Sequence, residues 1–67
     1  MLYCNLKNIR KIKKITQKEI ADTLSIRQST VSAWENNIAY PNIIIAFNLA
    51  TYLNVGIDEI WIKKNYS

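Results

Sequence analysis

Apolar residues recur at helical spacing along almost the whole chain, which contains one glycine, Gly56, and one proline, Pro41. Because these two residue types mark turns and break regular elements, a chain with so few of them has short loops, and helical spacing leaves room for few strands. Its 67 residues, 49% of them hydrophobic, suffice for one compact core but not for a second domain. The sequence therefore predicts one all-α domain over residues 1–67.

Capping residues delimit the first two of five predicted helices. Asn5 is placed to cap the first helix, and Thr16 with Glu19 forms the S/T-x-x-E capping box that opens the second. Apolar residues recur at every third position of the first helix: Leu6, Ile9 and Ile12.

The remaining three helices are separated by turn-forming segments. The third runs over about residues 28–36, and Asn42 is placed to cap the fourth. The fifth begins at Ile57 and ends near residue 61. The β-prone segments 1–4 and 61–66 allow a short two-stranded ribbon between the termini. The residues predicted to form the structural core are Ile20, Ala21, Val31, Trp34, Leu49 and Leu53.

The charge balance favours a polyanionic partner. Nine Lys and Arg residues against five Asp and Glu residues give a net charge of +4. The basic residues gather in the first part of the chain: Lys7, Arg10, Lys11, Lys13, Lys14 and Lys18. They form either the solvated face of a helix or a rim that attracts DNA, and composition does not decide between these two.

Several classes of protein are excluded by what the sequence lacks. With no histidine and a single cysteine, Cys4, it has neither an intramolecular disulfide nor a zinc site. No serine or cysteine stands beside a general base, which argues against an enzyme, and nothing indicates a cofactor or a small-molecule ligand. No apolar run approaches about 18 residues, and no signal segment opens the chain. We expect a soluble cytoplasmic protein.

Two helices joined by a tight turn, over residues 17–24 and 28–36, have the proportions of a helix-turn-helix. At about 100° per residue, one side of the second helix carries residues expected to pack on the domain: Arg27, Val31, Trp34 and Ile38. The other side carries small or polar uncharged side chains: Gln28, Ser29, Ser32, Ala33 and Asn36. Such a face suits the base edges and phosphates of a major groove. The alternative is an ordinary amphipathic helix with a solvated polar face.

Four segments of the chain carry a combined pattern. Residues 16–21 read T-Q-K-E-I-A, residues 26–36 read I-R-Q-S-T-V-S-A-W-E-N, and Pro41 and residues 49–55 follow. Together they resemble the Cro and lambda-repressor (XRE) family of helix-turn-helix proteins, whose pattern is T-Q-x-x-[LI]-A, [VI]-S-x-x-T-[VI]-S-x-W-E-x-G, P and [IL]-A-x-x-L-x-V. The resemblance covers about residues 6–60. It implies a five-helix fold, dimers on palindromic operators, and control of transcription, usually repression.

The resemblance and the side-chain chemistry together indicate which residues contact DNA. Gln28 is the strongest candidate for reading a base, because a glutamine amide can bond both N6 and N7 of adenine. The predicted base contacts are Gln28, Ser29, Ser32 and Ala33, of which the two serines suit a phosphate equally well. The predicted contacts with the DNA backbone are Gln17, Lys18, Arg27, Thr30, Asn36 and Asn42. The resemblance further implies that Gln17 braces the recognition helix and that Glu35 pairs with Arg10.

Three positions depart from the family pattern. Arg27 stands where a capping Ser or Thr is usual, so the recognition helix lacks a side-chain cap but has a cation that can reach a phosphate. Ser25 replaces the usual turn glycine. Asn37 replaces the glycine after W-E-x, and asparagine tolerates the left-handed backbone conformation well. These departures bear on stability more than on function.

The fourth and fifth helices and the tail carry more apolar residues than one buried stripe needs. We interpret the excess as a homodimer contact: Ile44, Ile45, Tyr52, Ile57, Trp61 and Ile62. The alternative is a slightly apolar surface without a partner. The predicted function is that of a sequence-specific DNA-binding repressor acting as a homodimer. The alternative is an antitoxin-like module that uses the same fold to mask a protein partner.

Overall fold

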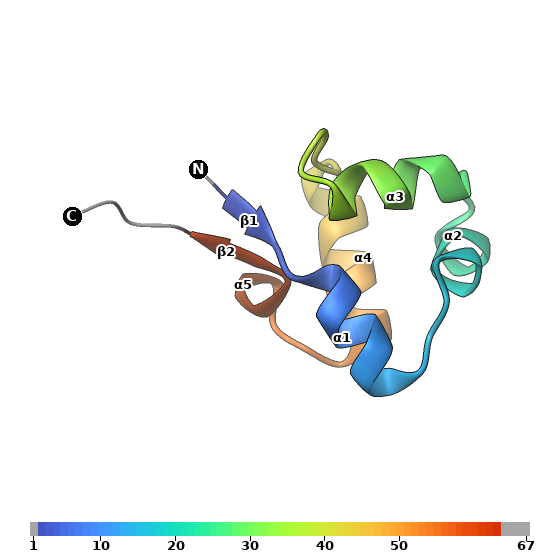
Figure 1. Ribbon diagram of the computed structural model, residues 1–67, viewed down its shortest axis with the longest axis horizontal. Coiled ribbons are helices and arrows are strands. Elements are labelled where there is room, and N and C mark those ends of the chain that lie inside the picture. Colours follow the sequence, from blue (N-terminus) through green and yellow to red (C-terminus); the bar gives the residue numbers. More distant parts are fainter. Residues whose placement is uncertain (1, 64–67) are drawn as a thin grey trace.

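The computed structural model of the protein describes residues 2–63 as five helices and a two-stranded antiparallel sheet (Figure 1). The elements in chain order are β1 (Leu2–Cys4), α1 (Leu6–Lys13), α2 (Gln17–Leu24), α3 (Gln28–Glu35), α4 (Ile43–Leu53), α5 (Ile57–Ile60) and β2 (Trp61–Lys63). The predicted five helices and the ribbon are confirmed. In the ribbon, Leu2 pairs with Lys63 and Cys4 with Trp61. The predicted ribbon residues 1 and 64–66 lie outside the described residues.

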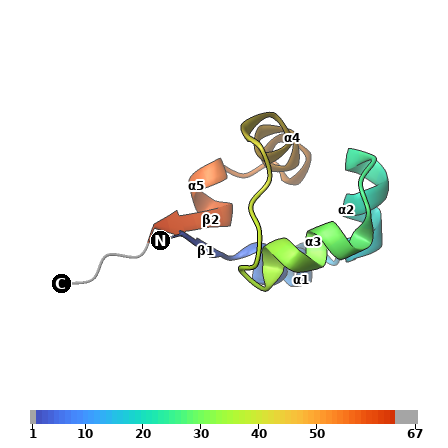
Figure 2. The same cartoon turned by 90° about the horizontal axis from the view of Figure 1, so that it is seen from above.

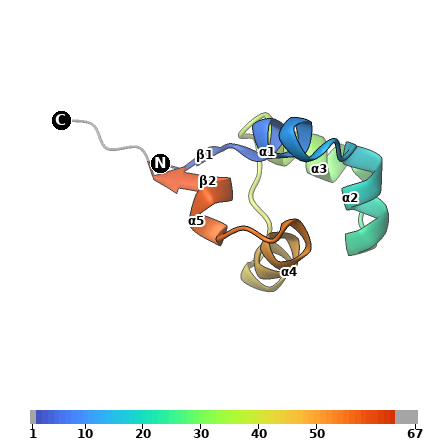
Figure 3. The ribbon, with the colours of Figure 1, turned by 90° about the horizontal axis from the view of Figure 1, so that it is seen from below.

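The helix-turn-helix and the ribbon occupy different parts of the molecule. Helices α2 and α3 meet at one end, and α5 and the ribbon lie at the other (Figure 2). Helix α4 lies across from α1 and α3, and residues 36–42 carry the chain from α3 to α4 (Figure 3). Any surface formed by α4 and α5 is therefore separate from the outward face of α3.

Two of the three predicted helix caps are present. The Thr16 hydroxyl accepts the Glu19 N–H at 3.0 Å, and the Glu19 carboxylate accepts the Thr16 N–H at 3.3 Å. The Asn42 side chain accepts the Ile45 N–H at 2.9 Å. The prediction that Asn5 caps α1 is wrong, because its side-chain oxygen instead accepts a hydrogen bond from the amide of Asn8 at 2.8 Å.

Left-handed residues end three helices and shape the turn after a fourth. Lys14, Ser25 and Asn54 close α1, α2 and α4 with φ of 59°, 57° and 56°. Asn37, which follows α3 and replaces the family's glycine, has φ of 59°, a conformation that asparagine tolerates well. Its side-chain oxygen accepts the backbone N–H of Cys4 at 2.9 Å, which ties β1 to the turn after the recognition helix.

Within residues 2–63, every buried residue is apolar, and together these residues form one core. Its two aromatic rings, Trp34 and Trp61, meet edge to face with centroids 6.2 Å apart and planes at 71°, an arrangement that aromatic pairs prefer. The six residues expected in the core all lie in it: Ile20, Ala21, Val31, Trp34, Leu49 and Leu53.

The prediction that Trp61 contacts a second copy of the chain is wrong. Its side chain is 7% exposed and belongs to the core. Because side chains alternate between the two faces of a strand, pairing of β2 with β1 turns Trp61 inward and leaves Ile62 exposed.

Two residues expected on the inward side of α3, Arg27 and Ile38, are instead exposed, Ile38 by 77%. Ile12, the third apolar residue at a spacing of three in α1, is 81% exposed. A spacing of three residues falls about 60° short of a full helical turn at each step, so Ile12 lies about 120° around α1 from the buried Leu6. Ile38 follows the left-handed Asn37, and this residue takes the chain out of the register of α3.

Candidate nucleic-acid interface

Buried anchors set the orientation of the recognition helix α3. Val31 and Trp34 lie three residues apart on its inner side, and both are buried in the core. The turn from α2 is closed by Ser25, in the left-handed conformation, and by a 2.9 Å hydrogen bond from the Ile26 N–H to the carbonyl of Ala21. These contacts fix α3 against α2 in a helix-turn-helix.

The outward side of α3 is polar and carries neither an acid nor a bulky apolar residue. Ser29 and Asn36 lie opposite the buried anchors and are exposed, and Gln28 is exposed at one edge. Ser32 and Ala33 lie between them and are half-buried. The four predicted base-contacting residues therefore share one accessible face of α3.

A chain of polar contacts links α1 to this face. Arg10 donates from Nε and Nη2 to the two carboxylate oxygens of Glu35, with the Nη2 bond at 2.9 Å. The pair that the resemblance implies is therefore present. Gln17 donates from Nε2 to Glu35 Oε1 at 2.9 Å, and Gln28 donates from Nε2 to Gln17 Oε1 at 3.4 Å. Gln17 thus contacts both ends of α3.

The ion pair between Arg10 and Glu35, which begins this series of polar contacts, is mostly buried. The side chains of Arg10 and Glu35 are 13% and 4% exposed. Burial acts to raise the pKa of Glu35, but hydrogen bonds from Arg10 and Gln17 and the charge of Arg10 outweigh it and lower the pKa. The hydrogen bond to Glu35 raises the pKa of Arg10 in turn. Both groups are therefore charged at neutral pH.

These polar contacts leave hydrogen-bonding groups of Gln17 and Gln28 available to DNA. A side-chain amide has two N–H donors and a carbonyl acceptor. Gln28 uses one donor on Gln17, so its second donor and its carbonyl can still address a base. Gln17 uses one donor on Glu35, and its second donor can address a phosphate.

Several predicted backbone contacts already have partners within the protein. Lys18 forms an ion pair with Asp22 at 2.9 Å, and both side chains are largely exposed. The Asn36 amide donates to the Ser32 carbonyl at 2.9 Å and to the Ser32 hydroxyl at 3.3 Å. Arg27 begins α3 without a side-chain cap, as predicted, and is exposed.

Two further backbone candidates are placed less favourably. Thr30 is half-buried at the inner edge of α3. Asn42 begins α4, across residues 36–42 from the recognition helix (Figure 2). The structure therefore gathers Gln17, Lys18 and Arg27 near the start of α3 and separates Asn42 from them.

The residues expected at a dimer contact are dispersed. Ile44, Tyr52 and Ile62 are exposed, whereas Ile45 and Ile57 are half-buried and pack against the core. At about 100° per residue, Tyr52 lies about 80° around α4 from Ile44. Three of the six residues predicted at the contact are therefore exposed, on two different elements.

Sequence reasoning missed two exposed apolar residues on α4, Ile43 and Phe47. They are 68% and 52% exposed, and their spacing of four places them on one side of α4. Phe47 and Ile57 line the same surface depression between α4 and α5. The spacing of four was visible in the sequence, but the position of α5 beside it was not.

Two kinds of feature are absent from residues 2–63. No group of three or more His, Cys, Asp or Glu side chains lies close enough to hold a metal ion. No helix in this range has the length and apolar character needed to cross a membrane.

Comparison with known proteins gives a consistent result. The helix-turn-helix family model matches residues 6–60, from the start of α1 to the end of α5. The chain is 31% identical over 55 residues to the HTH-type transcriptional activator BcrR of Enterococcus faecalis, covering 82% of this chain and 27% of that protein. It is 37% identical over 56 residues to the uncharacterized HTH-type transcriptional regulator YqaE of Bacillus subtilis, covering 84% and 48%.

Two further matches cover most of this chain. It is 32% identical over 60 residues to the uncharacterized HTH-type transcriptional regulator MJ0272 of Methanocaldococcus jannaschii, covering 90% of this chain and 91% of that protein. A solved structure of a transcriptional regulator from Listeria innocua superposes with a TM-score of 0.79 at 27% identity, covering 94% of this chain and 59% of that one. The chain belongs to the helix-turn-helix family of DNA-binding transcriptional regulators.

Proposed function

We propose that this chain represses transcription in the cytoplasm by binding a palindromic DNA operator as a homodimer, with α3 in the major groove. A major groove about 12 Å wide admits one helix. The outward face of α3 presents amide, hydroxyl and methyl groups to it, and the net charge of +4 favours approach to DNA.

The observation that carries this proposal is the chain of contacts from Arg10 through Glu35 and Gln17 to Gln28. A mostly buried ion pair supports an amide at the edge of the reading face. Such support reduces the side-chain freedom that Gln28 loses on binding a base, which favours affinity. An ordinary solvated helix face has no need of this support.

Lys18, beside α3, can exchange its partner within the protein for a DNA phosphate. The exposed pair between Lys18 and Asp22 is of a kind that contributes little to stability, so a phosphate can take the place of the Asp22 carboxylate. Arg27 and the second N–H of Gln17 lie near the same helix terminus. Together they place positive charge and donors where the DNA backbone flanks the groove.

The homodimer follows from the size of the reading face. One recognition helix covers only a short part of the groove, and two-fold dimers place two such helices about 34 Å apart on successive major grooves. We place the proposed contact on the exposed side of α4, with Phe47 at its centre and Ile44 beside it. Exposed aromatic and aliphatic clusters of this kind are typical of interfaces.

Repression is the simplest regulatory outcome of operator binding. A bound dimer that overlaps a promoter blocks transcription by occupancy, and family resemblance supports this outcome. One relative is named as an activator, and a reporter assay distinguishes the two directions of regulation.

The experiment that tests the proposal is selection of bound fragments from random DNA, followed by binding measurements across a salt series. We expect two inverted half-sites about one helical turn apart. If the dimer neutralises about 6–10 phosphates, log affinity falls against log salt with a slope of about −5 to −9. No enriched sequence and no salt dependence would contradict DNA binding. If expression of a reporter gene rises with the amount of protein, the proposal of repression is wrong, but the proposal of DNA binding stands.

A further inference from the structure

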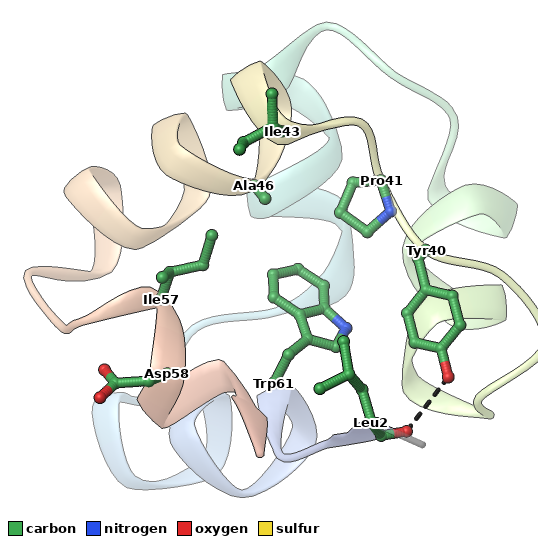
Figure 4. A pocket seen from close by; sticks show the side chains of 8 residues that line it. All are labelled: Leu2, Tyr40, Pro41, Ile43, Ala46, Ile57, Asp58 and Trp61. Carbon is green, nitrogen blue, oxygen red and sulfur yellow. Dashed lines mark hydrogen bonds between the residues drawn. The ribbon is translucent and has the colours of Figure 1, made fainter. Parts of the chain in front are cut away.

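An apolar hollow lies between β1, residues 40–41, α4, α5 and the start of β2 (Figure 4). Its volume is about 350 Å³, within the range of about 300–1,000 Å³ that small-molecule sites occupy. The side chains that form most of its wall are Leu2, Tyr40, Ile43, Ala46, Ile57 and Trp61. Four separate segments supply these residues, so nothing in the sequence spacing indicates the hollow.

One wall of the hollow contains a buried hydrogen-bond donor. The indole Nε1 of Trp61 is inaccessible to solvent, and it has no acceptor among residues 2–63. Buried N–H groups in native proteins nearly always have an acceptor, because leaving one unpaired is destabilising. Figure 4 shows this nitrogen on the edge of the ring that faces Leu2 and Tyr40, at the side of the hollow.

The two residues drawn nearest this nitrogen in Figure 4, Leu2 and Tyr40, lie at the surface. Tyr40 is held against β1 by a 3.1 Å hydrogen bond from its hydroxyl to the backbone carbonyl of Leu2, and this bond is itself exposed to water. Access to the indole N–H from the hollow requires these exposed side chains to turn aside, and water can replace the hydrogen bond that Tyr40 then loses.

Charge restricts what the hollow accepts. Asp58 is the charged residue among those that line it, and no Lys or Arg of the described chain does so. In Figure 4 its carboxylate points away from the indole. An anion would meet a carboxylate and no cation, which is unfavourable. A neutral compound avoids this repulsion.

We infer that the hollow binds a small neutral carbonyl compound, a ketone or an amide with an aromatic or branched aliphatic group, whose oxygen accepts the Trp61 indole N–H. The apolar group lies against Ile43, Ala46 and Ile57, and the carbonyl replaces the missing acceptor. Binding at this site is independent of base reading by α3.

A matched pair of probes tests this assignment. Acetophenone and α-methylstyrene have the same shape, but the second carries a CH₂ group where the first has its carbonyl oxygen. The two tryptophans give two indole N–H resonances in a ¹H–¹⁵N spectrum of the ¹⁵N-labelled protein. We expect acetophenone to shift the Trp61 resonance saturably and to leave Trp34 nearly unchanged. α-Methylstyrene should bind about five- to tenfold more weakly, the loss expected for one hydrogen bond.

Two neighbouring isoleucines provide the matched variants. Ile43 lines the hollow and Ile44 does not, and both are exposed on α4, so neither substitution should unfold the protein. Ile43→Ser should weaken acetophenone binding several-fold, and Ile44→Ser should leave it unchanged. Equal affinity of the two probes, or equal effects of the two variants, would overturn the inference.

A second copy of the chain is the competing occupant of the hollow. Titrations at two protein concentrations tenfold apart separate the two occupants. If a small molecule is the occupant, dilution leaves the ligand-free Trp61 resonance unchanged and acetophenone still shifts it. If dilution alone moves the resonance and acetophenone gives no saturable shift, a second copy fills the hollow and the inference is wrong.

Discussion

The two ends of the molecule differ in how their side chains are held. At the α2–α3 end, a mostly buried ion pair and side-chain amides fix the recognition helix, and its outward face is polar. At the α4–α5 end, packing on the core holds the elements, and large apolar side chains such as Ile43, Ile44 and Phe47 remain exposed. The first end suits a hydrogen-bonded, charged partner, and the second suits an apolar one.

This difference indicates how the two ends respond to change. Directional contacts at the α2–α3 end depend on protonation and on single polar atoms. Packing at the other end depends on buried area and tolerates conservative exchange. Both ends share the contact between Trp34 and Trp61, which joins the recognition helix to the ribbon.

The largest expected effect comes from removing that shared contact. Trp34→Ala deletes an indole that is 2% exposed, and such deletions cost about 3–5 kcal/mol, much of the stability of a small domain. We expect a largely unfolded protein by circular dichroism and chemical denaturation. Ile12→Ala, at an exposed position, should change the free energy of unfolding by less than about 0.5 kcal/mol. A normally folded Trp34→Ala variant would show that α3 does not depend on this contact.

The next effect isolates the ion pair at the α2–α3 end. Glu35→Gln leaves the mostly buried Arg10 without its counter-charge, which should cost about 3 kcal/mol at pH 7. Because folding lowers the pKa of Glu35 from its ordinary 4.5, its contribution is complete above pH 4.5 and is lost as pH falls through the lowered value. The stability difference between wild type and Glu35→Gln should therefore shrink only in acid.

Asp22→Asn is the matched control for that experiment. It removes an equally close but exposed pair with Lys18, and we expect a change within about 0.5 kcal/mol at any pH. If the difference in free energy of unfolding between wild type and Glu35→Gln stays constant down to pH 3, the charge of Glu35 is not what stabilises the pair with Arg10.

The α4–α5 end is tested by charge substitutions on two sides of α4. Phe47→Glu should leave the fold intact and weaken dimerisation about thirtyfold or more, or about 2 kcal/mol, as measured by sedimentation. Tyr52→Glu, about 140° around the helix, should leave the dimer unchanged. The opposite pattern would place the dimer contact on the Tyr52 side of α4.

Local chemistry explains why much of the fold could be predicted from sequence. The Thr16–Glu19 capping box, the Asn42 cap and the left-handed Asn37 each depend on residues close together in the chain. The prediction for Asn5 failed because a nearby amide, on Asn8, competed for the same oxygen.

The features that could not be predicted depend on contacts between distant segments. Trp61 lies inward because β2 pairs with β1 from the other end of the chain. Phe47 lies beside Ile57 because of how α5 returns onto α4. In the site, the Arg10–Glu35 pair came from the family resemblance, whereas the link from Gln17 to Gln28 required the positions of both helices. Helical periodicity predicts on which side of a helix a residue lies, but not which distant residue it contacts.

The central claim is that Gln28, supported from Arg10 through Glu35 and Gln17, reads one base pair in each half-site. The most direct measurement compares wild type and Gln28→Ala on the selected operator and on operators changed at single base pairs, with Asn48→Ala, at an exposed position of α4, as control. We expect Gln28→Ala to weaken operator binding about tenfold and to remove the preference at one A·T pair per half-site, with circular dichroism unchanged. Equal losses on operator and random DNA would contradict the claim.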